Sequence, residues 1–214
     1  MKATVDMWSD PTCPWCYIGH QRLKNVLAGL SGRHCPRIVW RAFLLNPAMP
    51  ADGMERNAWL ARAFGNSRLA ETTLERITRY GLAEGIPFAF SAITRTPSAL
   101  RAHALILGVH DSGRQRDVID GIFRSHFVAG RDIGDPGVLA DIAEDAGFSR
   151  VEALTWIDSI PLTRRLLHDA RKAREGGIRS VPFFVFNRRL AIGGAQSAEV
   201  LRRLVTAASD CAEL

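Results

Sequence analysis

The chain has 214 residues, of which 47% are hydrophobic and 23% are charged, a composition typical of globular proteins. This length fits one large domain, or one domain with a second domain inserted into it. The formal net charge of +6 would permit nucleic-acid binding, but the basic residues are mostly scattered arginines, without a basic tail or an aromatic-interleaved stripe. We therefore expect a solvated, arginine-rich surface and no nucleic-acid partner.

The N-terminal sequence lacks the pattern of a signal peptide, because Asp6 interrupts the apolar stretch and no small-residue cleavage site follows. The sequence also contains no run of about 18 apolar residues that would cross a membrane. We therefore expect a cytoplasmic protein without a membrane partner. Cytosolic thiols are kept largely reduced, so a close cysteine pair there is more often catalytic or metal-binding than a structural disulfide.

The first part of the chain is predicted to form a strand, a helix and a second strand. Residues 3–8 alternate and are rich in strand-forming types, and apolar residues then recur at helical spacing over 14–30. Residues 37–45 are predicted to form the second strand. This β-α-β start places two of the four cysteines, Cys13 and Cys16, at the opening of its helix.

The middle of the chain is predicted to be almost entirely helical. Glycine and proline mark the breaks, and Asp135 followed by Pro136 is typical of a helix start, with the aspartate as N-cap and the proline in the first position. The predicted helices cover residues 55–65, 67–84, 98–112, 115–128, 136–146 and 150–158.

β-Structure returns near the C-terminus. A helix is predicted over 162–175, followed by an apolar strand over 180–186, a short strand over 190–192 and a final helix over 197–209.

Two β-rich ends around a helical block predict one α/β domain built from parts that are remote in sequence. We assign residues 1–50 and 161–214 to this domain, and residues 51–160 to a large inserted all-helical domain.

The Cys13–Cys16 pair carries the main chemical signal. A cysteine in the first turn of a helix faces unpaired backbone N–H groups and the positive end of the helix dipole. Both stabilise a thiolate, the nucleophile in disulfide exchange. We expect Cys13 to be the exposed attacking thiol with a lowered pKa, and Cys16 to be buried and to resolve the mixed disulfide. Pro14 suits the first turn, and Trp15 is expected at the surface beside the pair.

The segment Ser180-Val181-Pro182-Phe183 is the second candidate element. Only about 5–6% of X-Pro bonds in folded proteins are cis, so a trans proline that starts a strand is an alternative. In the α/β arrangement, however, this loop would close over the start of the first helix. A cis bond there would turn the Val181 backbone toward the dithiol, where it could pair with an extended substrate and hold the substrate sulfur near Cys13.

Cys13-Pro14-Trp15-Cys16 combined with Ser180-Val181-Pro182 resembles the thioredoxin-like superfamily, and the long helical insertion resembles its DsbA branch. More narrowly, several phrases resemble the FrnE-like DsbA-family oxidoreductases in the order of that family. These are Trp8-Ser9-Asp10 with Cys13 to Gly19, then Arg41 to Pro47, Gly130 to Pro136, Val181 to Val185, and Ile192 to Gln196.

The resemblance implies a thioredoxin-like fold with an inserted helical domain, a redox-active disulfide, and a valine–cis-proline loop that faces it. It implies that Cys13 is the nucleophile, Cys16 the resolving thiol and Pro182 the cis-proline. Many relatives keep a buried acid under the dithiol to relay protons, for which Asp6 and Asp10 are the candidates. The dipeptide between the cysteines differs from that of thioredoxin and of the periplasmic oxidant, so no reduction potential carries over.

Other readings of the cysteines and of His20 stay open. A zinc half-site is the alternative for Cys13 and Cys16, but zinc prefers four ligands and Cys35 and Cys211 stand alone, so no metal site is expected. Cys35 and Cys211 are expected to be incidental thiols, with a second redox or intermolecular role as the alternative. His20 is expected to be a solvated helix residue, although a cation on the side of Cys13 would favour the thiolate.

We expect a protein-disulfide oxidoreductase that acts on protein or small-molecule thiols and disulfides, with a thioredoxin- or glutathione-type redox partner. No prosthetic group is required, and glutathione is the candidate co-substrate. The alternatives are a glutathione-dependent isomerase or transferase on the same fold, whose members typically have serine in place of Cys13, and a chaperone-like peptide-binding protein. A homodimer is a further alternative that the sequence does not decide.

Overall fold

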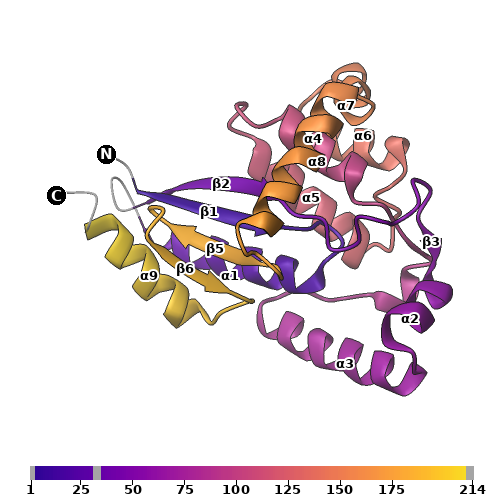
Figure 1. The fold of residues 1–214 in the computed structure, drawn as a ribbon, viewed down its shortest axis with the longest axis horizontal. Coiled ribbons are helices and arrows are strands. Elements are labelled where there is room, and N and C mark those ends of the chain that lie inside the picture. The colour runs from indigo at the N-terminus through magenta and orange to yellow at the C-terminus, as the bar shows by residue number, and fades with distance from the viewer. Residues whose placement is uncertain (1–2, 31–34, 211–214) are drawn as a thin grey trace. The chain divides into compact units, whose positions relative to one another are not determined.

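The structure, a computed structural model, describes residues 3–30 and 35–210 (Figure 1). Its contacts divide the chain into two compact units. Unit 1 consists of Met1–Leu45 and Asp169–Leu214, and unit 2 is the continuous segment Asn46–His168. These bounds lie a few residues away from the domain ranges that we expected. The second boundary falls inside helix α8 (Ile160–Glu175), whereas the sequence placed it at the start of that helix.

Unit 1 is built on a four-stranded mixed sheet in the order β2-β1-β5-β6. Its strands are β1 (Thr4–Ser9), β2 (Arg37–Ala42), β5 (Phe183–Phe186) and β6 (Leu190–Gly193). Strand β1 pairs in parallel with β2 and antiparallel with β5, so Met7 lies between Trp40 and Phe184 in the register. A central strand from the start of the chain is therefore completed by a strand from near its end.

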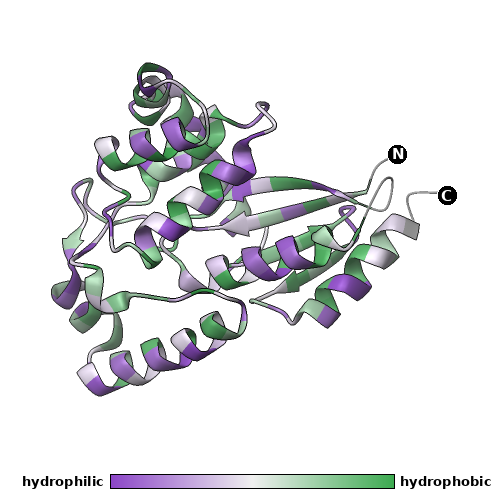
Figure 2. Ribbon diagram, turned by 180° about the vertical axis from the view of Figure 1, so that it is seen from behind, coloured by the Kyte–Doolittle hydropathy of each residue, from purple (hydrophilic) through white to green (hydrophobic). Residues whose placement is uncertain are grey.

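Helices α1 (Pro14–Ala28) and α9 (Ala198–Asp210) pack on one face of this sheet (Figure 1). Because side chains alternate along a strand, Val5 and Met7 of β1 point into the core on this face. Figure 2 shows the mixed hydrophobic and hydrophilic colouring of α9, which is typical of a helix with one buried face. The buried core residues are Ala3, Val5, Met7, Leu23, Val26, Leu27, Phe184, Phe186, Leu201, Val205 and Ala208.

The turn between β5 and β6 fastens the sheet to the last helix. Asn187 and Arg188 adopt positive φ angles of 47° and 57°, as the two central residues of a tight hairpin turn often do. The Asn187 carboxamide oxygen accepts a hydrogen bond from the Thr4 N–H at 2.8 Å, and its amide donates to the Ala208 carbonyl at 2.6 Å. One side chain thus joins β1, the hairpin and α9.

Unit 2 is helical, as expected, apart from two short antiparallel strands, β3 (Met54–Glu55) and β4 (Arg95–Thr96). The sequence analysis did not predict these strands, because two residues are too few to show an alternating pattern. The other elements are α2 (Arg56–Phe64), α3 (Ser67–Ala83), the 3-10 helix η2 (Phe90–Ala92), α4 (Leu100–Gly108), α5 (Gln115–Phe127), α6 (Pro136–Asp145), α7 (Arg150–Ile157) and the first part of α8.

Side-chain caps account for several helix starts in unit 2. Asp135 accepts hydrogen bonds from the Gly137 and Val138 N–H groups, and Pro136 occupies the first position, which confirms the predicted start of α6. Ser149 and Glu152 form a capping box at the start of α7.

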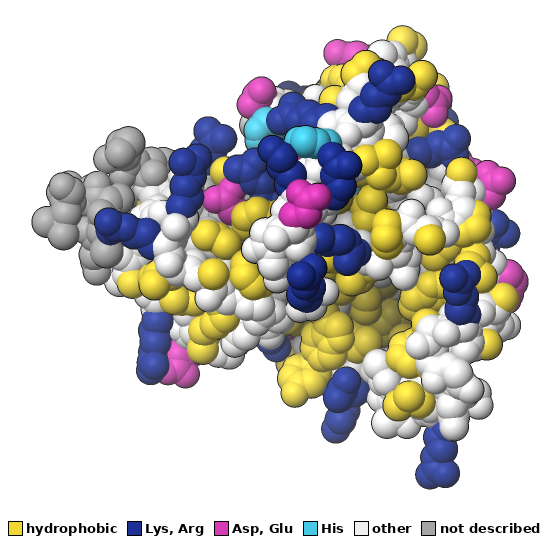
Figure 3. All heavy atoms as spheres, in the orientation of Figure 1, with side chains coloured by type: hydrophobic (Ala, Val, Ile, Leu, Met, Phe, Trp, Pro, Cys, Tyr) yellow, Lys and Arg dark blue, Asp and Glu magenta, His cyan; other side chains and the backbone are white. Residues whose placement is uncertain are grey.

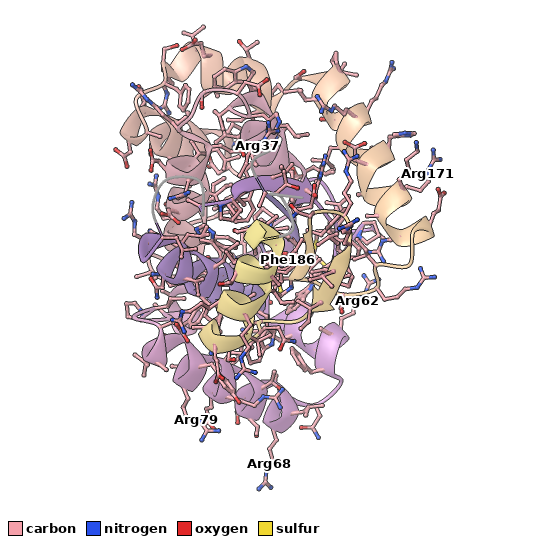
Figure 4. The ribbon with its side chains drawn as sticks, turned by 90° about the vertical axis from the view of Figure 1, so that its left-hand side faces the viewer. Arg37, Arg62, Arg68, Arg79, Arg171 and Phe186 are labelled. Carbon is pink, nitrogen blue, oxygen red and sulfur yellow. The ribbon has the colours of Figure 1, made fainter. Side chains whose placement is uncertain are left out.

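In Figure 3, lysine and arginine side chains gather over the upper middle of the face shown, and elsewhere they lie among apolar and uncharged atoms. In Figure 4, Arg68 and Arg79 project outward from α3, whereas Phe186 lies within unit 1 behind α9. No helix in the described part of the chain combines the length and apolar character needed to cross a bilayer.

Gly19 allows α1 to approach the Val181–Pro182 loop closely. A Cβ atom at this position would lie 2.8 Å from Pro182 Cγ and 3.4 Å from Phe184 Cζ. We expect Gly19→Ala to lower the free energy of unfolding by about 1–3 kcal/mol, the usual cost of overpacking. Denaturant titration measures this change. Gly29→Ala, at the end of the same helix, is the matched control, because its Cβ would meet only the Val26 carbonyl at 3.7 Å. Equal stability of the two variants would contradict the packing argument.

His126 should make unit 2 sensitive to acid. Burial lowers the pKa of its imidazole from 6.5 to about 4, assisted by the charge of Arg56, although the ring nitrogen hydrogen-bonds the Arg131 carbonyl at 3.3 Å. Between these pH values the unfolded chain binds more protons at this histidine than the folded chain does. The free energy of unfolding should therefore fall by about 3 kcal/mol as the pH is lowered through this window.

The test compares the pH dependence of unfolding in the wild type, His126→Asn and His168→Asn. Asparagine at position 126 offers a non-titrating amide donor to the same carbonyl, so the slope between pH 6.5 and about 4 should flatten in this variant. His168 is exposed, and its replacement should leave the slope unchanged. A slope that survives His126→Asn would show that other groups cause the acid sensitivity.

Candidate active site

The start of helix α1 carries both cysteines of the pair. Cys13 is the N-cap residue and Pro14 occupies the first helical turn, as the sequence predicted. The Cys13 carbonyl accepts hydrogen bonds from the Cys16 and Tyr17 N–H groups at 3.0 and 3.3 Å, which continue the turn into the helix. Neither of the two sulfur atoms takes part in a disulfide in the structure.

The expected exposure of Cys13 is wrong, since only 4% of this residue is accessible. The Val181–Pro182 loop of unit 1 accounts for part of this burial, because the Cys13 Sγ lies 3.8 Å from the Val181 carbonyl oxygen and donates to it. Periodicity within one helix cannot reveal a cover that comes from a loop far along the chain. Trp15, in the middle of the pair, is half-buried.

The Val181–Pro182 peptide bond is cis, and its loop faces the pair as the sequence led us to expect. The Pro182 carbonyl accepts a hydrogen bond from the Gly194 N–H at 2.8 Å, and Gly194 follows the end of β6. The loop is therefore held from the side of the hairpin as well as by α1.

Arg22 of α1 holds the segment after β6, a role that the sequence analysis missed. Its Nη1 atom donates to the carbonyls of Ala195 and Gln196 at 2.7 and 3.3 Å. The Gln196 side chain donates to the Gly193 carbonyl at 2.6 Å. These bonds give a physical role to the segment Gly193–Gln196. They fix this segment, which supports the Val181–Pro182 loop opposite the dithiol. No sequence signal could find this role, because the acceptors of Arg22 are backbone atoms.

Cys16 is fully buried, with no accessible surface. Burial raises the pKa of its thiol well above the usual value, and the neighbouring Cys13 thiol adds to this increase. Two donors act in the opposite direction, namely the Asp10 N–H, which lies 3.5 Å from the sulfur, and the Ser9 side chain. Cys16 thus occupies the buried position that the sequence predicted for it.

The two acid candidates have different surroundings. The Asp6 carboxylate pairs with Arg41 Nε at 2.7 Å, and alternation along β1 points it away from the face that packs on α1. Asp10 is 1% exposed, and its carboxylate accepts hydrogen bonds from the N–H and hydroxyl groups of Thr12 and from the Leu45 N–H at 2.7–2.8 Å. Asp10 reaches the Cys16 sulfur through its backbone N–H.

His20 is buried, and its ring packs against Trp40 with the centroids 4.9 Å apart. The expectation of a solvated histidine is therefore wrong. Its spacing from Cys16 and Leu23 on the buried face of α1 is the signal that would have placed it inside.

The remaining cysteines do not join the pair in the described part of the chain. Cys35 is half-buried, and its thiol contacts the Pro36 carbonyl at 3.9 Å. Cys211 lies outside the described residues. Among residues 3–30 and 35–210, no group of three or more His, Cys, Asp or Glu side chains has an arrangement that could hold a metal ion.

Several solved structures are similar to this chain over nearly its whole length. A probable DsbA oxidoreductase from Streptomyces coelicolor is 29% identical, with a TM-score of 0.85, over 96% of this chain and 89% of that one. The cytosolic disulfide reductase DsbM from Pseudomonas aeruginosa, solved with glutathione, is 18% identical, with a TM-score of 0.70, over 99% and 100% of the two chains.

A 2-hydroxychromene-2-carboxylate isomerase is 17% identical, with a TM-score of 0.67, over 98% of this chain and 97% of that one. The same fold thus occurs in a reductase and in an isomerase. A search of curated protein sequences found no match.

The family comparison covers nearly the whole chain. Residues 4–206 match the DSBA-like thioredoxin domain, from the first strand into the last helix. The match includes the whole of the intervening helical unit and most of both parts of unit 1. The chain therefore belongs to the DSBA-like thioredoxin domain family and has its thioredoxin-like fold with a helical insertion.

Proposed function

We propose that this protein is a thiol-disulfide oxidoreductase in which Cys13 exchanges disulfides with the substrate and Cys16 resolves the mixed disulfide. The observation that carries the proposal is the cysteine pair at the N-terminus of α1, with the Cys13 sulfur 3.8 Å from the Val181 carbonyl. Thiolates are the attacking species in disulfide exchange, and Cys13 is the cysteine of the pair whose sulfur faces the Val181–Pro182 loop.

The reaction takes place in two exchanges. The Cys13 thiolate attacks one sulfur of a substrate disulfide, forms the Cys13–substrate bond and releases the other substrate sulfur as a thiolate. Cys16 then loses its proton and attacks the Cys13 sulfur, which forms the Cys13–Cys16 disulfide and releases the second substrate thiolate. Two electrons pass from the protein to the substrate. In the opposite direction a substrate dithiol reduces the Cys13–Cys16 disulfide through the same mixed disulfide.

The Val181–Pro182 loop is the proposed substrate-binding element. Its backbone faces the Cys13 sulfur, so an extended chain that pairs with Val181 would bring its own sulfur next to Cys13. Pro14 and Trp15 complete the motif, and the half-buried indole offers an apolar contact to substrates.

Protein or small-molecule thiols and disulfides are the proposed substrates, and the chemistry requires no prosthetic group. Glutathione is the proposed co-substrate or resetting partner, with a thioredoxin-type protein as the alternative. The similarity to the glutathione-bound DsbM structure supports this choice, and the description of DsbM as cytosolic supports a cytoplasmic setting.

Replacing each cysteine by serine separates the two roles. After incubation with oxidised glutathione, Cys16→Ser should accumulate a stable mixed disulfide on Cys13, because no thiol remains to resolve it. Cys13→Ser should form no adduct at the pair, and Cys35→Ser should behave like the wild type. Mass spectrometry of acid-trapped protein, with peptide mapping of the adduct, measures this outcome.

The same material reveals the direction of electron flow. Equilibration of the wild type in glutathione buffers gives the reduction potential of the pair. A potential above about −180 mV indicates a disulfide donor or an isomerase, and one near about −270 mV indicates a reductase. A pair that fails to exchange with glutathione would contradict the proposal. Catalysis that survives Cys16→Ser with bound glutathione would favour an isomerase or a transferase.

A further inference from the structure

The buried sulfur of Cys16 poses a chemical problem for the proposed reaction. When the Cys13–Cys16 disulfide opens by attack at Cys13, the electron pair of the broken bond stays on Cys16. This residue has no accessible surface, so water cannot solvate the new thiolate. The protein itself must supply the hydrogen-bond donors.

Ser9 lies where such a donor is needed. It is the last residue of β1, and alternation places it on the same face as Val5 and Met7, which pack on the side of α1. The residue is 5% exposed, and its side chain acts as a donor that lowers the pKa of the Cys16 thiol. The Ser9 carbonyl accepts a hydrogen bond from the Phe43 N–H at 3.0 Å, which fixes the backbone at the end of the strand.

The Asp10 N–H is the second donor, 3.5 Å from the same sulfur. The Asp10 carboxylate accepts hydrogen bonds from Thr12 on one side and from the Leu45 N–H on the other. These bonds fix the Asp10 backbone and therefore the direction of its N–H group. Both donors are thus in place before any charge develops on Cys16. Donors that need no reorganisation are the most effective stabilisers of a developing anion.

We propose that the Ser9 hydroxyl, together with the Asp10 N–H, stabilises the Cys16 thiolate and thereby sets the rate at which the Cys13–Cys16 disulfide opens and closes. This inference rests on the proposed function of the pair and assigns to Ser9 a role in both directions of the exchange. In opening, a glutathione thiolate forms a bond to the Cys13 sulfur and the Cys13–Cys16 bond breaks. Cys16 leaves as a thiolate that accepts hydrogen bonds from the Ser9 hydroxyl and the Asp10 N–H. In closing, the same thiolate attacks Cys13 and glutathione leaves.

Few other ionisable groups surround this sulfur. Cys13 lies on the same helix and raises the pKa of Cys16, whereas Ser9 and the Asp10 backbone lower it. The Asp10 carboxylate is directed at Thr12 and Leu45, His20 packs on Trp40 one turn further along α1, and Asp6 pairs with Arg41. The strand β5 and the Val181–Pro182 loop contribute no charged side chain. The hydroxyl of Ser9 is therefore the donor that a single substitution removes.

The test measures the opening of the oxidised pair by excess reduced glutathione in a rapid-mixing experiment followed by Trp15 fluorescence or trapped-thiol mass. Ser9→Ala should slow opening by about three- to tenfold, because a hydrogen bond to a charged group is lost and a leaving thiolate of higher pKa leaves more slowly. Closing of the glutathione mixed disulfide should need a higher pH to reach half of its maximum rate. The equilibrium potential near neutral pH should change little, since Cys16 is then a neutral thiol in the reduced protein.

Matched variants separate the donor from general packing. Ser209→Ala removes another buried hydroxyl of unit 1, which donates to the Val205 carbonyl at 2.9 Å within α9, and it should leave both rates unchanged. Ser9→Thr keeps a hydroxyl and should retain most of the opening rate. Ser9→Gly removes the same hydroxyl and provides the measurement in place of Ser9→Ala should that variant fail to fold.

The outcomes are distinct from those that test the proposed function. Opening at the wild-type rate with an unchanged pH midpoint in Ser9→Ala or Ser9→Gly would overturn the inference, and so would equal slowing in Ser9→Thr. In either case the wild-type pair still exchanges with glutathione, and the proposed function stands. A wild-type pair that does not exchange would instead remove the proposed function on which the inference rests.

Discussion

A buried carboxylate at the turn between β1 and α1 fixes the geometry on which the dithiol depends. Asp10 binds Thr12 ahead of the helix and Leu45 after the neighbouring strand, so the turn cannot shift without breaking hydrogen bonds to an almost inaccessible anion. The rest of the site follows from this turn. It sets the start of α1, presents Cys13 at the helix N-terminus and leaves the Asp10 N–H pointing at the sulfur of Cys16.

Local signals in the sequence were sufficient to predict most of the helices and strands and the general arrangement of the fold. Alternation predicted β1, glycines and prolines marked the helix ends, and Asp135 before Pro136 marked the start of α6. The second strand was predicted to continue to residue 45, but β2 ends at Ala42. The segment after Ala42 turns toward the β1–α1 loop, where the Leu45 N–H donates to the Asp10 carboxylate. The short strands β3 and β4 pair residues that are far apart in sequence, and no local pattern predicts them.

The cysteine pair and the loop that faces it were predictable from the sequence, whereas the groups that support them were not. The spacing of Cys13 and Cys16 and a resemblance in sequence identified the pair and the loop that faces it. The burial of Cys13 and the role of Arg22 come from partners more than 160 positions away, since the sequence separations are 168 and 173. Ser9 continues the alternation of Val5 and Met7, but the predicted strand ended at residue 8, so the sequence analysis did not assign Ser9 to the helix-facing side of β1. What the sequence lacked was the position of Cys16 relative to that strand.

The order of the chain has a consequence for biosynthesis. Strand β1 is central in its sheet, yet one of its two neighbours, β5, follows the whole of unit 2 in the chain and is therefore made much later. Unit 2 is continuous and has the connectivity to fold while the ribosome is still at work, whereas the sheet of unit 1 must wait for residues 183–193. Cys13 and Cys16 therefore leave the exit tunnel early, and Cys13 stays without the Val181–Pro182 loop that covers it until unit 2 has been made.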